Sequence, residues 1–518
     1  MSDDTQDEVF RLLAEPATHG GAAVKRIDTH AAAVFLAGDA AYKVKRAVKF
    51  PFLDFSTLDK RKAALEAEIA ANCPFAPELY CEVIPIVRRN GALALGGDGD
   101  VVEWALKMHR FDEEETLDRL ADAGRIDTPL IEALARAVAS AHARAPVVDA
   151  SRWVAALGDY IEQNDTAMRE RADLFEPHAI ASHTTASRAA LARVRPLLLA
   201  RGAEGLIRRG HGDLHLGNIA LIEGRPIPFD ALEFDPVVAS GDVLYDLAFL
   251  LMDLVERKLP HAANCVLNVY LGATRHPTDL DALAALPLFM SLRAAIRAKV
   301  TAARLANSAS DRRQAIAARA KAYFALACDL IAPPPPRLVA IGGLSGTGKS
   351  VLARALAPHV TPSPGAVLLR SDVERKAMFG VAENEKLPPQ GYAADVGEKV
   401  YATLADKARR VLAAGHSAII DAVFAREHER TTVAELARTN TFDFRGLFLT
   451  ADLATRVARV GNRVHDASDA DAAVAQAQER YALGAMDWIE IDASGTLEQT
   501  LARTRAALNA RMIARAGD

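Results

Sequence analysis

The chain has 518 residues, which exceeds what one hydrophobic core usually supports, so we expect at least two domains. Half of the residues are hydrophobic and a quarter are charged, which is ordinary for globular proteins and argues against extensive disorder. The net charge of −5 gives no general attraction to nucleic acid or to an anionic membrane, so both are disfavoured as partners.

The cysteines and the N-terminus bear on the compartment. The cysteines are scattered without C-x-x-C spacing, which predicts neither a zinc site nor a disulfide framework. The first residues, MSDDTQDEVF, are acidic and polar, unlike a secretory signal, and no apolar run is long enough to span a bilayer. These features predict a cytoplasmic protein.

The first third of the chain has strand patterns followed by helix patterns. Residues 31–50 read as two strands joined by a turn at AGDA, and residues 57–72 read as a helix with Ser56 or Thr57 as its N-cap. Further strands are expected at 80–87 and 100–111, and from Glu113 to about Gly202 the pattern is mostly helical. We therefore predict a strand-rich lobe over about 1–108 and a helical lobe over about 109–332.

Four prolines at residues 333–336 mark the predicted domain boundary, because they remove backbone donors and favour a stiff, extended connection. The Ala-, Leu- and Arg-rich segment before them predicts one or two long helices that close the first domain. After them, RLVAIGG reads as a strand that leads into a glycine loop. A second domain, of α/β type, is expected over 337–518.

The segment from 207 to 235 carries the chemistry of the first domain. Phosphoryl transfer needs a cation for the phosphates, carboxylates for magnesium and a group that positions the attacking hydroxyl. Asp213 lies in HGDLHLGN, Asn218 follows five residues later, and Asp230 ends the apolar strand PIPFD.

At these residues the domain resembles the aminoglycoside phosphotransferase and choline kinase branch of the protein-kinase-like fold, whose signature is H-G-D-x-x-x-x-N followed by an apolar strand ending in Asp. The segment GDVLYDLAFL, residues 241–250, resembles the G-D-x-x-x-D-L-A helix of that family. The resemblance implies a bilobal fold that uses ATP, with Asp213 as the catalytic base. It also implies that Asn218 and Asp230 hold magnesium.

The same family pairs a strand lysine with a helix glutamate. AYKVKR offers Lys43 and Lys45 on one face of a strand, so spacing alone cannot choose between them, although the apolar approach favours Lys43. Glu66 and Glu68 are the possible partners in the helix. Glu68 is favoured, because Asn72 and two apolar residues flank it on the side that turns inward.

The strand VEWALKM, residues 102–108, resembles the hinge whose backbone would bind adenine near Glu103 to Ala105. No G-x-G-x-x-G loop precedes the lysine strand, which argues against a protein kinase proper. Two other interpretations stay open. His211, Asp213 and His215 could form a metal cluster, and the lysines could be a solvated edge-strand face.

The second domain opens with GLSGTGKS, residues 343–350, which satisfies G-x-x-x-x-G-K-[ST] between a strand and an amphipathic helix. Its glycines let the backbone curl so that amides and the helix N-terminus face the phosphates of ATP, while the lysine reaches the β and γ phosphates and the last serine binds magnesium. The expected nucleotide-binding residues are Gly343, Ser345, Gly346, Thr347, Gly348, Lys349 and Ser350.

Two further apolar strands end in carboxylates, one at Asp372 with Arg375 close behind, and one at Asp421. With the P-loop, this order resembles the adenylate, shikimate and gluconate kinases and, at SDVER, chloramphenicol phosphotransferase and zeta-toxin-like kinases. The resemblance implies a parallel sheet with a mobile, arginine-bearing lid. Asp372 would be the base or the orienting carboxylate for the acceptor hydroxyl. Arg375 would bind a substrate anion or phosphate, and Asp421 would orient magnesium through water or bind substrate.

The lid roles fall on Arg459 and Arg463, which would stabilise the transferred phosphoryl group. The alternative is that residues 456–463 form a solvated helix face.

We therefore expect two ATP- and magnesium-dependent phosphotransferase domains that act on hydroxyl groups of small molecules. One alternative is a single catalytic domain regulated by the other as an ATP sensor, and another is an antibiotic-inactivating enzyme. The sequence identifies neither acceptor and gives no oligomeric state.

Overall fold

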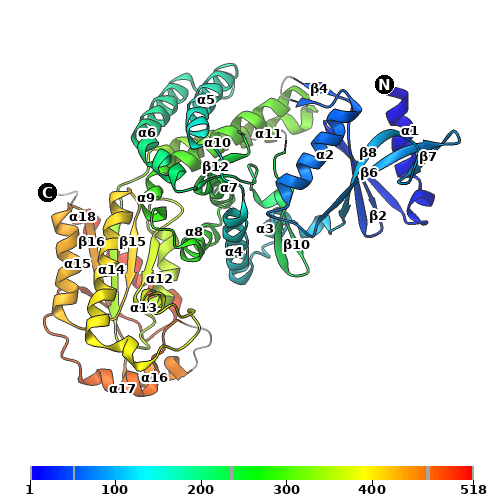
Figure 1. The fold of residues 1–518 in the computed structure, drawn as a ribbon. Helices are drawn as coiled ribbons and strands as arrows, with labels where there is room; N and C mark the ends of the chain where they lie inside the picture. Colours follow the sequence, from blue (N-terminus) through cyan, green and yellow to red (C-terminus); the bar gives the residue numbers. More distant parts are fainter. Residues whose placement is uncertain (1–2, 51–52, 234–236, 308, 462–466, 516–518) are drawn as a thin grey trace. The chain divides into compact units, whose positions relative to one another are not determined.

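A computed structural model describes residues 3–50, 53–233, 237–307, 309–461 and 467–515 (Figure 1). The chain divides into two compact units: the N-terminal unit joins Met1–Ala167 to Leu191–Asp253, and the C-terminal unit joins Met168–Ala190 to Leu254–Asp518. The proline segment at 333–336 lies inside the second unit, between α11 (Ser310–Ile331) and β13 (Arg337–Gly343). The domain boundary proposed there stays a prediction.

The N-terminal unit is built on a six-stranded antiparallel sheet in the order β1-β2-β3-β8-β6-β7. Its strands are β1 (Val24–Asp28), β2 (Ala32–Ala37), β3 (Ala40–Lys45), β6 (Tyr80–Arg89), β7 (Ala92–Leu95) and β8 (Asp100–His109). The turn expected at AGDA joins β2 to β3, so β3 lies inside the sheet and not at its edge.

Two helices cover opposite faces of this sheet. Phe10 of α1 (Asp3–Ala14) packs in a cluster with Phe35 and Ala105, and Leu65 of α2 (Leu58–Asn72) packs in another with Leu106. Because successive side chains of a strand point to opposite faces, two neighbours on β8 serve the two clusters. Thr57 caps α2, as one of the two predicted N-caps, by accepting from the Lys60 amide at 3.3 Å.

Short strands and helices complete the region before residue 257. They are β4 (Lys49–Phe50), β5 (Leu53–Asp54), α3 (Leu117–Asp122), α4 (Thr128–Arg144), α5 (Ala150–Arg169), α6 (Pro177–Ala203), β9 (Ile207–Arg209), β10 (Ile219–Ile222), β11 (Arg225–Pro228), β12 (Ser240–Asp242) and α7 (Val243–Glu256). The hairpin β10–β11 and the helix α7 position the first site.

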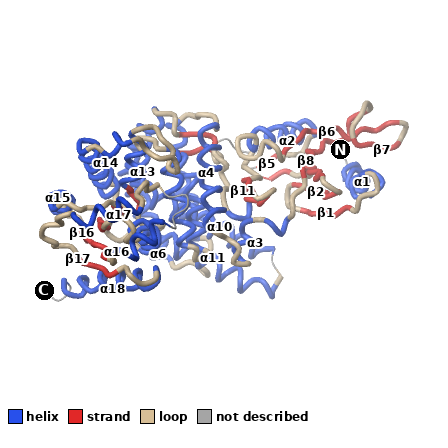
Figure 2. Tube along the Cα trace, turned by 90° about the horizontal axis from the view of Figure 1, so that it is seen from below, coloured by secondary structure: helices blue, strands red, loops and turns tan. Residues whose placement is uncertain are grey.

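The C-terminal unit contains a five-stranded parallel sheet in the order β14-β15-β13-β16-β17. Its remaining strands are β14 (Val367–Arg370), β15 (Ala418–Asp421), β16 (Asp443–Thr450) and β17 (Ile489–Asp492). Buried residues of β13, β15, β16 and β17 form one core with α12 (Lys349–Leu356) and α18 (Leu497–Arg515). In Figure 2, β16 and β17 lie between α15 (Glu427–Thr439) and α18.

The helices of this unit include α8 (Pro260–Thr274), α9 (Asp279–Ala282) and α10 (Leu286–Ala303) before the sheet. After β13 come α12 (Lys349–Leu356), α13 (Ser371–Met378), α14 (Ala394–Ala413), α15 (Glu427–Thr439), α16 (Leu453–Gly461), α17 (Ala472–Ala477) and α18 (Leu497–Arg515). The predicted fold class is confirmed: a region with an antiparallel sheet and many helices precedes a parallel sheet of α/β type. Within the described residues, no helix has the length and apolar composition needed to cross a bilayer.

Candidate active sites

A cavity of about 470 Å³ lies in the N-terminal unit. Among the residues that line it are Lys43 and Lys45 of β3, Tyr80 of β6, Met108 to Phe111 at the end of β8, and Asp213, Asp230 and Glu233 from the loops beside the β10–β11 hairpin.

The two lysines of β3 share one carboxylate of α2. Lys43 Nζ lies 2.6 Å from Glu68 Oε1 and 3.0 Å from Asp230 Oδ1. Lys45 Nζ lies 2.7 Å from Glu68 Oε2 and 2.6 Å from Glu233 Oε1. Glu68 is fully buried, whereas Glu66 is exposed and pairs with a lysine of its own helix at 3.6 Å. Because β3 is an inner strand, the edge-strand interpretation of these lysines is wrong.

These contacts keep the cluster charged. Burial opposes the charge of Lys43, but the carboxylates of Asp230 and Glu68 outweigh it and hold the lysine pKa well above its ordinary value. Lys43 in turn holds the pKa of the Asp230 carboxyl below its ordinary value. A cation that could bind phosphate therefore lies beside a carboxylate that could bind a metal.

The loop that carries Asp213 is fixed by α7. The backbone amides of His211 and Gly212 both donate to the Asp246 carboxylate at 2.8 Å, which gives the GDVLYDLAFL segment a structural role. Asn218 Nδ2 donates to the carbonyl and to the carboxylate of Asp213, each at 3.0 Å. The candidate base is thus oriented by the neighbouring candidate metal ligand.

The donor set fits magnesium. Asn218 directly precedes β10 and Asp230 closely follows β11, so the hairpin brings both to its open end. Amide and carboxylate oxygens are the hard ligands that magnesium prefers.

The alternative histidine cluster is not formed. The His211 ring hydrogen-bonds the Phe229 carbonyl at 2.9 Å, and burial lowers its pKa, so it is neutral at pH 7. The His215 ring accepts from the Gly217 amide at 3.1 Å. Among the described residues, no three or more His, Cys, Asp or Glu side chains form a group that could hold a metal ion.

The structure corrects the predicted adenine contacts. Glu103 and Ala105 lie in the middle of β8, paired with β6, and both are fully buried. The Glu103 carboxylate binds Arg61 Nε at 2.9 Å instead of facing the cavity. The β8 pattern identified the strand correctly, but the segment that reaches the cavity is its end, Met108 to Phe111.

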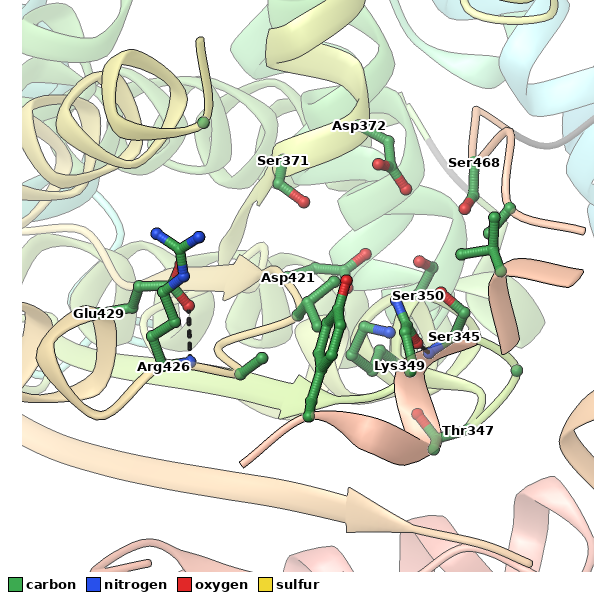
Figure 3. A pocket seen from close by; sticks show the side chains of 18 of the residues that line it. Ser345, Thr347, Lys349, Ser350, Ser371, Asp372, Asp421, Arg426, Glu429 and Ser468 are labelled. Carbon is green, nitrogen blue, oxygen red and sulfur yellow. Dashed lines mark hydrogen bonds between the residues drawn. The ribbon is translucent and has the colours of Figure 1, made fainter. Parts of the chain in front are cut away.

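A second cavity, of about 1270 Å³, lies in the C-terminal unit at the carboxyl end of β13 (Figure 3). The P-loop from Ser345 to Ser350 lines it, and α12 begins at Lys349. Gly346 and Gly348 have φ of +87° and +91°, and a Cβ at Gly346 would lie 2.4 Å from the Arg456 carbonyl oxygen. Backbone conformation therefore favours glycine at both positions, and space also requires it at Gly346.

Two carboxylates from neighbouring strands line the same cavity. Asp421 ends β15, as predicted, and accepts from Arg370 Nε at 3.3 Å. Asp372 lies in the first turn of α13, because β14 ends at Arg370 and not at Asp372 itself. Burial and the nearby Asp421 raise the pKa of the Asp372 carboxyl. Figure 3 shows both carboxylates around the space that Lys349 and Ser350 border.

Arg375 also lines this cavity, as its predicted role requires. Its guanidinium donates to the Gly391 carbonyl at 2.8 Å and lies 5.5 Å from the centre of the Tyr392 ring. A partly buried guanidinium beside an aromatic ring is a suitable site for an anionic group of a substrate.

Arg456 and Arg459 do not lie on a solvated helix face. Arg456 is buried, pairs with Glu479 and lies next to the P-loop carbonyl of Ser345. Arg459 lines the cavity and donates to the carbonyls of Ala493 and Gly495 at 2.8 and 2.9 Å. The predicted Arg463 lies outside the described residues.

Several cavity residues escaped the sequence analysis. In the N-terminal unit, Tyr80 lies far from the motif residues in sequence. Glu233 follows Asp230 closely but is not part of the signature. In the C-terminal unit, the Gln478 side chain accepts from the Ser345 amide at 2.6 Å. No local pattern announces these residues.

Comparisons with known proteins agree with the two-part organisation. A family model described as an AAA domain matches residues 338–483. Uncharacterized proteins of Mycobacterium tuberculosis (strain H37Rv) and Mycobacterium bovis are 29% identical over 489 residues, covering 92% of this chain and 93% of theirs. Since this similarity is longer than either predicted domain, those chains share both parts.

Among solved structures, a choline/ethanolamine kinase family protein from Mesorhizobium loti is 15% identical, covers 63% of this chain and 99% of its own, and has a TM-score of 0.38. A gluconokinase from Sinorhizobium meliloti 1021 is 18% identical, covers 34% of this chain and 97% of its own, and has a TM-score of 0.25. The two predicted resemblances are thus found again, the first in the N-terminal part and the second in the C-terminal part.

Proposed function

We propose that each half of the chain transfers a phosphoryl group from magnesium ATP to a hydroxyl group of a small molecule. One observation supports both halves: each brings a phosphate-binding lysine together with carboxylates at one cavity. These residues are Lys43, Asp213 and Asp230 in the first cavity and Lys349, Asp372 and Asp421 in the second.

In the N-terminal half, Lys43 would contact the phosphates while Glu68 holds it in place. Asp213 would accept the proton of the acceptor hydroxyl. The hydroxyl oxygen would then bond to the γ phosphorus as the bond between that phosphorus and ADP breaks. Asn218 and Asp230 would hold magnesium, which neutralises charge on the phosphates. The backbone of 108–111, and not that of Glu103 to Ala105, would bind adenine.

In the C-terminal half, the P-loop amides, Lys349 and Ser350 would bind the phosphates and magnesium. Asp372 would take the acceptor proton, which its raised pKa favours. Asp421 would orient magnesium through water, and Arg375 would bind an anionic group of the acceptor. Arg459 and Arg463 would stabilise the transferred group.

The test uses the full-length chain and measures ADP release with sugars, amino alcohols, aminoglycosides and nucleosides as acceptors. Asp213→Asn and Lys349→Ala are made separately and together, with the exposed Glu66→Gln and Lys399→Met as controls. We expect each site variant to abolish ADP release with a different set of acceptors, and the double variant to abolish it with all.

A sensor role for one half predicts another pattern. One of the two variants would then abolish all turnover, while the other would change only its dependence on nucleotide concentration. That result would contradict two catalytic halves and would support one catalytic half that the other half regulates.

A further inference from the structure

The residue that would bind magnesium in the N-terminal half has an unusual backbone. Asp230 has φ of +59°, in the left-handed region that residues other than glycine rarely adopt. Such a conformation persists only where the surroundings fix it, and it is often found at functional sites. The contacts that fix Asp230 therefore bear on its function.

The segment on either side of Asp230 is held by the catalytic loop. The Phe229 amide donates to the Asn218 carbonyl, and the Leu232 amide donates to the His211 carbonyl, each at 2.9 Å. The His211 ring donates in turn to the Phe229 carbonyl at 2.9 Å. These bonds fix the segment's ends but leave the two central amides to other partners.

The two central amides are bound by side chains from the strand-rich region. The Asp230 amide donates to the Tyr80 hydroxyl, and the Ala231 amide donates to Asn72 Oδ1, each at 2.9 Å. Asn72 is fully buried and Tyr80 is 6% exposed, so water cannot easily replace either of them. A buried amide that loses its partner costs free energy, so both contacts favour the observed backbone over its alternatives.

Asn72 also connects this segment to the lysine pair. It lies one turn after Glu68 on α2, and its Nδ2 donates to the Glu68 carbonyl at 2.9 Å. The helix that orients Lys43 therefore also fixes the residue after Asp230.

We propose that Asn72 and Tyr80 are positioning residues that hold the Asp230 carboxylate where the nucleotide-bound metal would meet it. This inference rests on the proposed function of the N-terminal half. It concerns metal-dependent binding alone, because Lys43 and the cavity wall would still contact a nucleotide without metal.

The experiment uses the full-length chain carrying Lys349→Ala, so that the P-loop site is silent. Calorimetry measures its affinity for AMPPNP, a non-hydrolysable ATP analogue, with magnesium and with EDTA. Asn72→Ala and Tyr80→Phe are compared with Glu66→Gln, an exposed change on the same helix, and with Tyr42→Phe on β3. Neither control residue lines the cavity.

We expect magnesium to increase the affinity of the parent chain. Asn72→Ala and Tyr80→Phe should reduce this increase about tenfold or more, with the affinity in EDTA unchanged within about twofold. The two controls should keep the full increase. A variant that loses affinity with magnesium but not with EDTA has a misplaced metal ligand. A variant with a damaged fold would lose affinity under both conditions.

Three results would overturn the inference. The first is that both variants keep the increase that magnesium gives. The second is that Tyr80→Phe, which removes a single oxygen atom, lowers affinity equally in magnesium and in EDTA. The third is that the parent chain binds no AMPPNP, which would also overturn the proposed function. In the first two cases the parent still binds, and the proposed function stands.

Discussion

The two lysines of β3 share Glu68 and differ in their second partners. Each oxygen of its carboxylate takes one lysine, so the Lys–Glu pair alone does not identify the nucleotide ligand. Lys43 reaches Asp230 and its side chain is 16% exposed, while Lys45 reaches Glu233 and is 4% exposed. Both lysines contact two carboxylates, but Lys43 is the more exposed of the two, so a phosphate can reach it more easily than it can reach Lys45.

His416 gives the C-terminal unit a predictable response to acid. Its ring is buried and hydrogen-bonds the Gly365 carbonyl at 2.8 Å, and burial lowers its pKa to about 4. An ordinary histidine titrates near 6.5, so the unfolded chain binds the proton first as the pH falls. The stabilisation is complete above about pH 6.5 and is lost as the pH falls toward 4, with about 2 kcal/mol lost at pH 5.

The matched variant is His416→Gln, whose amide can still donate but does not titrate. Urea unfolding of the C-terminal unit, followed by hydrogen exchange of the β14 and β15 peptides, should show the wild type losing stability relative to this variant between pH 7 and pH 5. Parallel curves for the two proteins would show that His416 does not carry the acid response.

The motif residues of both sites were predictable because their spacing is local. Asp213 and Asn218 lie in one loop, and the P-loop is a single turn between a strand and a helix, so sequence neighbours become spatial neighbours. Tyr80 was not predictable, since its contact with Asp230 spans 150 residues and depends on tertiary packing. Asn72 was predictable in part. The helical period placed it on the inward side of the helix, but nothing in the sequence identified the Ala231 amide as its partner.

At the level of elements, β8 and α2 are joined by a buried ion pair. Arg61 Nε donates to both oxygens of Glu103 at 2.9 Å, and Gln6 Nε2 donates to the same carboxylate at 2.8 Å. Both charged side chains are fully buried. Removing one charge from such a pair leaves the other poorly solvated and typically costs about 3–5 kcal/mol.

We therefore expect Glu103→Gln to destabilise the N-terminal unit by about 3–5 kcal/mol without a specific effect on nucleotide affinity. Tryptophan emission during urea unfolding measures this in a Trp488→Phe background, because Trp104 and Trp153 both belong to the N-terminal unit. Glu82→Gln, an exposed carboxylate on β6, is the control. Weakened nucleotide binding with unchanged stability would instead place Glu103 at the adenine site.

This ion pair explains why the hinge was misplaced by sequence reasoning. The adenine contacts were predicted from the resemblance of the strand VEWALKM to a hinge, and that resemblance does not show which part of the strand reaches the cavity. The partner Arg61 is 42 residues away, so the sequence does not reveal that Glu103 is neutralised inside the core. The strands and helices themselves were predictable because their apolar periods are regular over whole elements.

At the level of the whole molecule, α8 belongs to the C-terminal unit although it precedes the proline segment. The strand β14 is at the edge of the parallel sheet, and α8 supplies the hydrogen bonds that a further strand would have made. Asn268 Oδ1 accepts from the Leu368 amide at 2.7 Å, and Asn264 Nδ2 donates to the Ala366 carbonyl at 3.0 Å.

A chain trimmed at the predicted boundary, from Arg337 onward, lacks these partners of the strand that leads to Asp372. We expect faster amide hydrogen exchange across β14 in the trimmed chain than in the full-length protein, because a partly buried amide and a buried carbonyl lose their partners. Asn268→Ala in the full-length chain should reproduce the increase at Leu368 and leave β16, on the other side of β13, unchanged. Asn440→Ala, at the exposed end of α15, serves as the control. Equal exchange of β14 in the trimmed and full-length chains would mean that the P-loop domain folds completely from Arg337, and that the proline segment is its true boundary.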